Sequence, residues 1–486
     1  MERFEELSVA WQAALANHLG SSMSGEGRVL NWAEPADSVR LAEEFLSGGE
    51  VDAPDSDRTE RFSNLLNVML SSGQNLHNPG YVGHQVPASN PIAGLFDAVG
   101  SLTNQPMAIY EMGPWATAVE HALVRRLCAK VGWNSDHSTG VLTHGGSLAN
   151  LTALLTARNV AFPDSWQNGV PSNAVLIAHA DAHYCVSRSA GILGLGTNRI
   201  IRADLDSDRR VCPAQLRQTI ERCEKEGQQI MAVVACACAT PIGAFDPIDQ
   251  IADICEQHSV WLHIDAAHGG SVLMSRQHRH LLKGIDRADS LVWDAHKMMF
   301  VPALCAAVLF KSRDHRFKTF EQDAPYLFDR NSPGMAEYDN GVRTVECTKR
   351  ALGFGLRGLW SMFGETLFEH LVDRTFELCR YMYNWIDDSS DFQAMHRPEC
   401  NILVFRHVPA KLAQAAPATV NQFQRMLRAE LVQSGDFYIV QTTIEGDLCL
   451  RACVMNPLTT PARLNELLLR IRQIGAGCLP DGPSKA

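Results

Sequence analysis

Short apolar runs that alternate with helical stretches are the feature that most constrains the fold of this chain. The runs are rich in β-forming residues and cover residues 174–178, 199–201, 231–236, 260–264, 290–293 and 305–310. Helical patterns separate them at 148–159, 213–225 and 248–258. Strands that are apolar on both faces and joined through helices are typical of a mostly parallel sheet with both faces covered. The middle of the chain is therefore predicted to be an α/β domain.

The two ends of the chain have a different character. Apolar residues at helical spacing predict N-terminal helices at 5–18 and 38–46. A long helical region at 349–387 leads into mixed strand and helix patterns. We expect a helical N-terminal segment over residues 1–90, a large α/β domain over 91–375 and a small α+β domain over 376–486.

Composition and charge exclude several classes of protein. With 46% hydrophobic and 20% charged residues among 486, the chain is not disordered as a whole. Its formal net charge of −11 disfavours nucleic acid and anionic membranes as partners. No apolar run reaches the ~20 residues of a membrane span, and the charged start lacks a signal-peptide core. The 14 scattered cysteines then indicate reduced thiols in a cytoplasmic protein.

Polar residues that follow apolar runs are candidate site residues, because open α/β sheets bind ligands at the carboxyl ends of their strands. Residues 143–147 (Thr-His-Gly-Gly-Ser) open a predicted helix. There, Gly146 and Ser147 offer close backbone approach and unpaired N–H groups to a phosphate. The alternative is an ordinary glycine turn in which Ser147 caps the helix.

Three more candidates follow predicted strands. Asp265 ends an apolar run, and a buried carboxylate needs a cation or strong donor, such as a protonated pyridine ring. Lys297 is flanked by apolar residues that favour Schiff-base chemistry, although a lone lysine is more often a snorkelling surface residue. His183 suits stacking on an aromatic ring, and equally suits a capping role.

Two metal sites were weighed against these patterns. Cys236 and Cys238 lie in an apolar run, which favours a buried strand. His263 and Asp265 share one face of a predicted strand, but His268 lies beyond a turn. We therefore expect no metal.

A phosphate cradle, a buried acid, a strand-end lysine and a stacking histidine are together the parts of a pyridoxal phosphate site. Their order, Gly-Gly-Ser, His-Tyr, His-Ile-Asp-Ala-Ala-His-Gly-Gly and Asp-Ala-His-Lys, resembles the group II pyridoxal-dependent decarboxylases of fold type I. This family includes glutamate, cysteine sulfinate, aromatic amino acid and 2,4-diaminobutyrate decarboxylases. The resemblance spans residues 78–469 and is greatest for the glutamate and cysteine sulfinate branch. Supporting pieces lie at 109–111, 183–186, 243–248 and 326–328.

The resemblance implies a lyase of amino acid metabolism, a homodimer with sites at the subunit interface, and roles for individual residues. Lys297 matches the Schiff-base lysine, Asp265 the pyridine partner and His183 the stacking histidine. Gly146, Ser147 and His296 match the phosphate side of the cofactor.

The resemblance also implies a substrate pocket and a substrate class. His84 and Gln85 fall in the region that lines the pocket in this family. Arg451 matches an arginine that meets a substrate carboxylate, a task suited to a bidentate guanidinium, although a structural ion pair is the alternative. The expected reaction is α-decarboxylation of an L-amino acid with an acidic side chain.

Two departures from the family pattern bear on the reaction. Residues 236–240 (Cys-Ala-Cys-Ala-Thr) replace a more usual Thr-Ala-Gly-Thr-Thr, so that a hydroxyl is lost at Ala239. Gly334 stands at the position of the loop tyrosine that protonates the substrate carbon in this family. Tyr338 is the candidate replacement, and another acid such as His183, or water, is the alternative proton donor. The alternative outcome is an oxidase or aldehyde synthase reaction.

Overall fold

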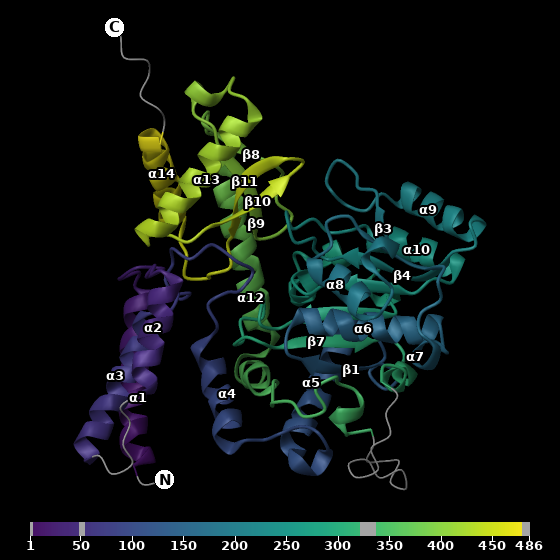
Figure 1. Ribbon diagram of the computed structural model, residues 1–486, viewed down its shortest axis with the longest axis horizontal. Helices are drawn as coiled ribbons and strands as arrows, with labels where there is room; N and C mark the ends of the chain where they lie inside the picture. The colour runs from purple at the N-terminus through teal and green to yellow at the C-terminus, as the bar shows by residue number, and fades with distance from the viewer. Residues whose placement is uncertain (1–2, 48–53, 321–336, 479–486) are drawn as a thin grey trace. The chain divides into compact units, whose positions relative to one another are not determined.

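The computed structural model describes residues 3–47, 54–320 and 337–478, which fall into two compact units (Figure 1). The large unit contains residues 85–376 and 398–400, and the second unit contains the described residues up to 84, 377–397 and those from 401 onward. The predicted boundaries at 90 and 375 stay predictions. In the described part of the chain, no helix is both long and apolar enough to cross a membrane.

The large unit is built on a seven-stranded sheet in the order β1-β7-β6-β5-β4-β2-β3. β7 is antiparallel to both of its neighbours, and the other pairs are parallel, which confirms the mostly parallel α/β sheet. The strands are β1 (Thr139–Thr143), β2 (Ala174–His179), β3 (Ile200–Ala203), β4 (Gln229–Cys236), β5 (Leu262–Asp265), β6 (Ser290–Asp294) and β7 (Ala306–Phe310).

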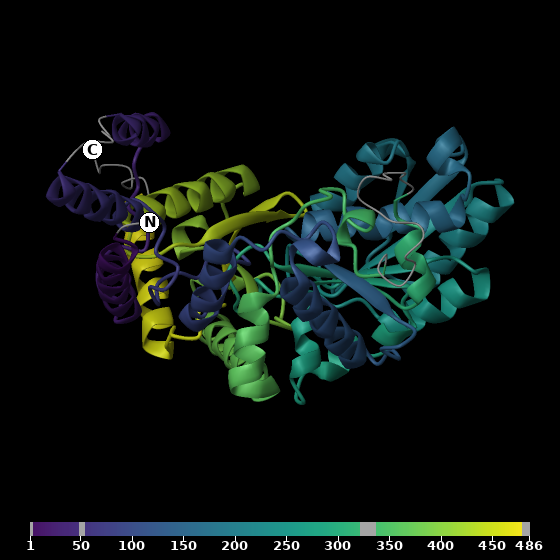
Figure 2. The same ribbon diagram turned by 90° about the horizontal axis from the view of Figure 1, so that it is seen from below.

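Both faces of this sheet are covered by helices. Every residue of β1, β2, β5, β6 and β7 is buried, which requires cover on each side, and Figures 1 and 2 show helices flanking the strands. The large unit contains α4 (Pro91–Thr103), α5 (Pro114–Val131), α6 (Gly146–Ala161), α7 (Ser165–Asn168), α8 (Tyr184–Ile192), α9 (Pro213–Lys225), α10 (Ile248–His258) and the first part of α12 (Phe354–Asp387), of which α5, α6, α9 and α10 contact the strands most.

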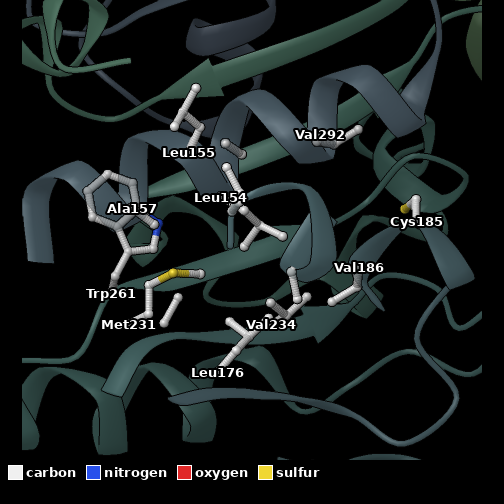
Figure 3. Packing of buried hydrophobic residues seen from close by; sticks show 14 of the residues in the cluster. Leu154, Leu155, Ala157, Leu176, Cys185, Val186, Met231, Val234, Trp261 and Val292 are labelled. Atoms are coloured by element: carbon white, nitrogen blue, oxygen red, sulfur yellow. The ribbon is translucent and has the colours of Figure 1, made fainter. Parts of the chain in front are cut away.

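The core under α6 holds the site-bearing strands in place. Figure 3 shows Leu154 and Leu155 of α6 in one apolar cluster with Leu176, Met231 and Val234 of β2 and β4. Burying such a side chain contributes about 1.5–3 kcal/mol, so this layer fixes α6 against the strand ends.

The second unit contains a four-stranded antiparallel sheet in the order β10-β11-β9-β8. Its strands are β8 (Phe392–Ala394), β9 (Ile402–His407), β10 (Val440–Ile444) and β11 (Asp447–Cys453), covered by α13 (Pro417–Ser434) and α14 (Pro461–Cys478). The same unit includes α1 (Phe4–Met23), α2 (Pro35–Leu46) and α3 (Asp55–Ser71). The N-terminal part joins it through backbone bonds, such as Val29 N–H to the Gly435 carbonyl at 2.7 Å.

Candidate active site

The register of three strands brings two loops to one edge of the large sheet. Thr143, the last residue of β1, and Asp294, the last residue of β6, both pair with Ala306 at the start of the intervening β7. The loop after β1 and the loop after β6 therefore start side by side. Asp265, at the end of β5, pairs with Val292 on the same side of the sheet. Positions far apart in sequence thus share one edge.

The loop after β1 opens α6 with very little space at its first residue. Gly145 has a φ of 95°, a conformation that favours glycine, and the helix begins at Gly146. A Cβ on Gly146 would lie 2.8 Å from Asp294 Oδ2, so a side chain does not fit without displacement. Ser147 is exposed in the first turn of α6, so the alternative that it caps the helix is wrong.

Lys297 lies beside a buried acid. Its Nζ is 3.6 Å from Asp294 Oδ2, and His296 Nε2 is also 3.6 Å from that oxygen. His296 Nδ1 lies 2.9 Å from the Cys305 carbonyl oxygen and 3.3 Å from the Cys305 nitrogen, and these contacts fix the imidazole. Burial raises the pKa of Asp294, although the charges of Lys297 and His296 oppose the effect.

His183 and Asp265 share the electrostatic environment of Lys297. The His183 Nδ1 accepts the Cys185 N–H at 3.3 Å, which caps α8, so the capping role expected as an alternative is present. Burial lowers the pKa of His183; the Asp265 charge opposes this shift and the Lys297 charge adds to it. Asp265 is buried, and its Oδ1 accepts the Ala267 N–H at 3.1 Å.

A buried histidine ties the start of α6 to the strands below it. His263 Nδ1 is 2.8 Å from Ser290 Oγ, and its Nε2 is 2.9 Å from Asn150 Oδ1. Asn150 in turn donates to the Gly146 carbonyl at 2.9 Å. Burial lowers the pKa of His263 to about 4, so the ring is neutral. Both of its ring nitrogens take part in hydrogen bonds.

The structure places Tyr338 in an aromatic group. Its ring lies 4.8 Å from the His121 ring and 5.8 Å from the Tyr110 ring, centroid to centroid. Gly334 and the motif at 326–328 lie outside the described residues, and the acid role of Tyr338 stays a prediction.

The predicted substrate residues divide between the two units. His84 and Arg451 belong to the second unit, whereas Gln85 is half-buried at the start of the large unit. Arg451 is buried on β11. The pKa of His84 is lowered chiefly by its own burial and further by the charge of Arg451. His84 Nε2 lies 3.1 Å from the Tyr438 hydroxyl.

The residues at the sheet edge fit pyridoxal phosphate. The N-terminus of the 16-residue α6 suits a phosphate, the Lys297 amine suits an aldehyde and the Asp265 carboxylate suits a pyridinium. Asp294 Oδ1 is buried and, within the described residues, has no hydrogen-bond partner, as expected for a polar group left for a ligand. When bound, the cofactor supplies an electron sink for the pair left as CO₂ departs.

Asp294 was missed as a site residue, although a signal for it exists. It ends a buried apolar strand, which is the criterion that identified Asp265. Cys185 was also missed: burial raises the pKa of its thiol, and the charges of Asp265, Lys297 and Asp294 all act on it. Cys185 does not end an apolar strand, so the criterion that applies to Asp294 does not identify it from the sequence. Ala239, where the family pattern would have a hydroxyl, is buried.

Comparisons with known proteins agree with this geometry. The family described as "Pyridoxal-dependent decarboxylase conserved domain" matches residues 51–408. An acidic amino acid decarboxylase of Bos taurus is 35% identical over 381 residues, covering 76% of this chain and 73% of its own. A cysteine sulfinic acid decarboxylase of Rattus norvegicus is 30% identical over 458 residues, covering 92% of this chain and 91% of its own.

Solved structures share the fold. The crystal structure of mouse CSAD has a TM-score of 0.86 at 29% identity, covering 97% of this chain and 98% of its own. A Rhodiola rosea 4-hydroxyphenylacetaldehyde synthase has a TM-score of 0.84 at 17% identity, over 98% of this chain and 99% of its own, a likeness of fold alone. The relatives that are 30–35% identical are decarboxylases of acidic amino acids, so the aldehyde-forming alternative is not favoured.

Proposed function

Because this chain belongs to the pyridoxal-dependent decarboxylases, and is thus a carboxy-lyase that uses pyridoxal phosphate, we propose that its substrate is an L-amino acid with an acidic side chain. Glutamate, aspartate and cysteine sulfinate are the members of this class. The names of the relatives that are 30–35% identical support the proposal, because they describe decarboxylases of acidic amino acids.

The observation in this chain that carries the proposal is the positive charge around Arg451. The guanidinium is 6% exposed, and it acts together with Arg428 on His84, whose pKa is lowered by burial first and then by these two cations. It also contributes to the lowered pKa of His396. A buried arginine near a second arginine is well suited to a carboxylate, which a guanidinium can bind in bidentate fashion. We propose that Arg451 binds the side-chain carboxylate of the substrate, and that His84 and Gln85 are also substrate-binding residues.

The roles of the large-unit residues complete the proposal. Lys297 carries the cofactor, and Asp265 holds the proton of the ring nitrogen. His183 stacks on the ring, and Gly146, Ser147 and His296 serve the phosphate. Tyr338 returns a proton to the substrate carbon.

The test is a panel of acidic, neutral and basic amino acids, scored for CO₂ and for the amine product. Arg451→Ala should weaken binding of the best acidic substrate by about 30- to 150-fold, since a lost charge-assisted pair costs about 2–3 kcal/mol. Arg451→Lys should restore only part of it, because an ammonium lacks the bidentate fork. Arg425→Ala, an exposed arginine on α13, is the control. A neutral or basic best substrate whose kinetics ignore Arg451→Ala contradicts the proposal.

We also propose that the chain acts as a cytoplasmic homodimer. Apolar side chains are exposed on the N-terminal helices, including Val39 and Leu46 of α2 and Leu95 and Leu102 of α4. α2 has no buried residue at all. Such apolar surface is typical of an interface. Sedimentation equilibrium should give twice the chain mass of 53.5 kDa, and a monomer at micromolar concentration would contradict the proposal.

A further inference from the structure

Three buried side chains of the large unit place two sulfur atoms and one imidazole nitrogen close together. They are Cys238, after β4, His268, after β5, and Cys400, from the short segment 398–400. One donor atom from each lies within 4.8 Å of the other two. Among the residues that the structure describes, this is the one group of three such donors at that spacing.

The distances within the group match a metal centre. Cys238 Sγ and Cys400 Sγ are 3.9 Å apart. In a tetrahedral zinc site with Zn–S bonds of about 2.3 Å, two sulfurs lie about 3.8 Å apart. A disulfide bond is about 2.05 Å long, so the pair is reduced in this structure, and its separation is compatible with two sulfurs on one metal ion.

Hydrogen bonds that use no donor atom of the group hold its three segments in place. The Ala237 N–H donates to the Asp265 carbonyl, and the Gly269 N–H donates to the Ala237 carbonyl, both at 2.9 Å. These bonds fix the segments of Cys238 and His268 against each other. On the third segment, Glu399 accepts the Phe245 N–H at 2.9 Å and is paired with Arg210. The group is therefore prearranged by its surroundings.

We propose that Cys238, His268 and Cys400 form a binding site for a thiophilic divalent cation, of which Zn²⁺ is the best match. Two thiolates and an imidazole are soft ligands, which select zinc over magnesium or calcium. On binding, two S–H bonds break, two Zn–S bonds form and two protons are released; no electron is transferred. Three protein ligands leave the fourth tetrahedral position to a small exogenous ligand.

The proposed metal ligands include none of the residues assigned to pyridoxal phosphate, but the two groups of residues are connected. Their link is the backbone between Asp265 and Gly269 together with the Ala237 bonds described above. The charge of Lys297 also acts on the Cys238 thiol. A bound cation would therefore alter the electrostatic environment of the cofactor residues without using them as ligands.

The experiment uses the reduced holoenzyme, freed of metal, with Co²⁺ as a spectroscopic probe and Zn²⁺ as competitor. We expect one equivalent of Co²⁺ to produce a thiolate charge-transfer band that Zn²⁺ removes, and elemental analysis to find one Zn²⁺ per chain. Cys400→Ser should weaken binding by more than about 100-fold, because even the loss of a group that only supports a ligand costs 10- to 100-fold. Cys255→Ser, a buried thiol of α10, is the matched control and should bind as the parent does.

Circular dichroism and cofactor absorbance establish whether each variant is folded. If Cys400→Ser does not fold, Cys400→Ala replaces it in the binding experiment. The proposal is wrong if the parent binds no Co²⁺, or if Cys400→Ser binds it as tightly as the parent. It is equally wrong if Zn²⁺ does not bind and mild oxidation by a peroxide yields only a Cys238–Cys400 disulfide, because the pair is then a redox pair.

Discussion

Lys297 has its amine 3.6 Å from the buried Asp294 Oδ2, and a substitution at position 297 tests the role of that amine. Lys297→Ala deletes the amine that we propose carries the cofactor, and we expect turnover to fall by several orders of magnitude. Borohydride should then no longer attach pyridoxal phosphate covalently, a change read by mass spectrometry. Lys311→Ala, at the residue that follows β7, is the control. An alanine variant at 297 that still retains the cofactor covalently would contradict the assignment.

Tyr338 tests how the substrate carbon receives its proton. A general acid contributes about 10²- to 10⁴-fold, so Tyr338→Phe should slow amine formation by that order and raise the aldehyde fraction. Tyr110→Phe is a matched control, because it removes the neighbouring hydroxyl and keeps the ring that contacts Tyr338. Both products are measured by chromatography. If Tyr338→Phe forms amine at the parent rate, Tyr338 is not the acid.

Single site residues can be predicted from the sequence where a polar or charged residue directly follows an apolar run. Lys297 and Asp265 are predicted from the sequence because a charged group at the end of a buried strand is costly unless it has a partner. Cys400 could not be found in this way. It lies 162 residues from Cys238, and only the fold brings the two thiols together.

At the scale of elements, the start of α6 is the most constrained feature of the site. Gly146→Ala adds a Cβ 2.8 Å from the buried Asp294 Oδ2, an overpacking that costs about 1–3 kcal/mol. Because Asp294 contacts Lys297, we expect pyridoxal phosphate affinity to fall by about 5- to 150-fold. Gly191→Ala is the control, since that helical glycine has nothing within 4 Å of its Cβ position. Equal cofactor affinity in the two variants would show that the close approach is unimportant.

Helices and strands can be located from the sequence where their apolar residues form a continuous run or recur at a regular spacing. β2, β4 and β6 have uninterrupted apolar runs and were located within a few residues. β1 is not predicted from the sequence, because only two of its five residues, Thr-Gly-Val-Leu-Thr, have apolar side chains. The antiparallel direction of β7 was also beyond reach, since an apolar run does not record its direction.

For the molecule as a whole, buried neutral histidines make stability depend on pH. Burial lowers the pKa of His263 and of His396, one in each unit, to about 4. Between about pH 6.5 and pH 4 the unfolded chain binds protons that the folded chain does not, so stability is complete above 6.5 and falls on acidification. His263 alone accounts for up to about 3 kcal/mol.

Urea unfolding at several values of pH measures this loss. The free energy of unfolding should decrease from about pH 7 to pH 5, and His263→Gln, which cannot titrate, should show a shallower decrease. A parent enzyme equally stable at both values would mean that His263 is not held neutral.

The place of β1 in the sheet has a consequence for how the enzyme is made. β1 lies at one end of the strand order, and its pairing partner β7 brings Phe310 opposite Thr139. A nascent chain therefore exposes the phosphate-binding turn long before the strand that positions it has left the ribosome. Contacts so distant in sequence form late, because the loop between them must first be closed. The last residues of β1 and β6, Thr143 and Asp294, both pair with Ala306 of β7. We therefore expect a prematurely terminated chain that lacks β7 not to bind the vitamin-derived cofactor.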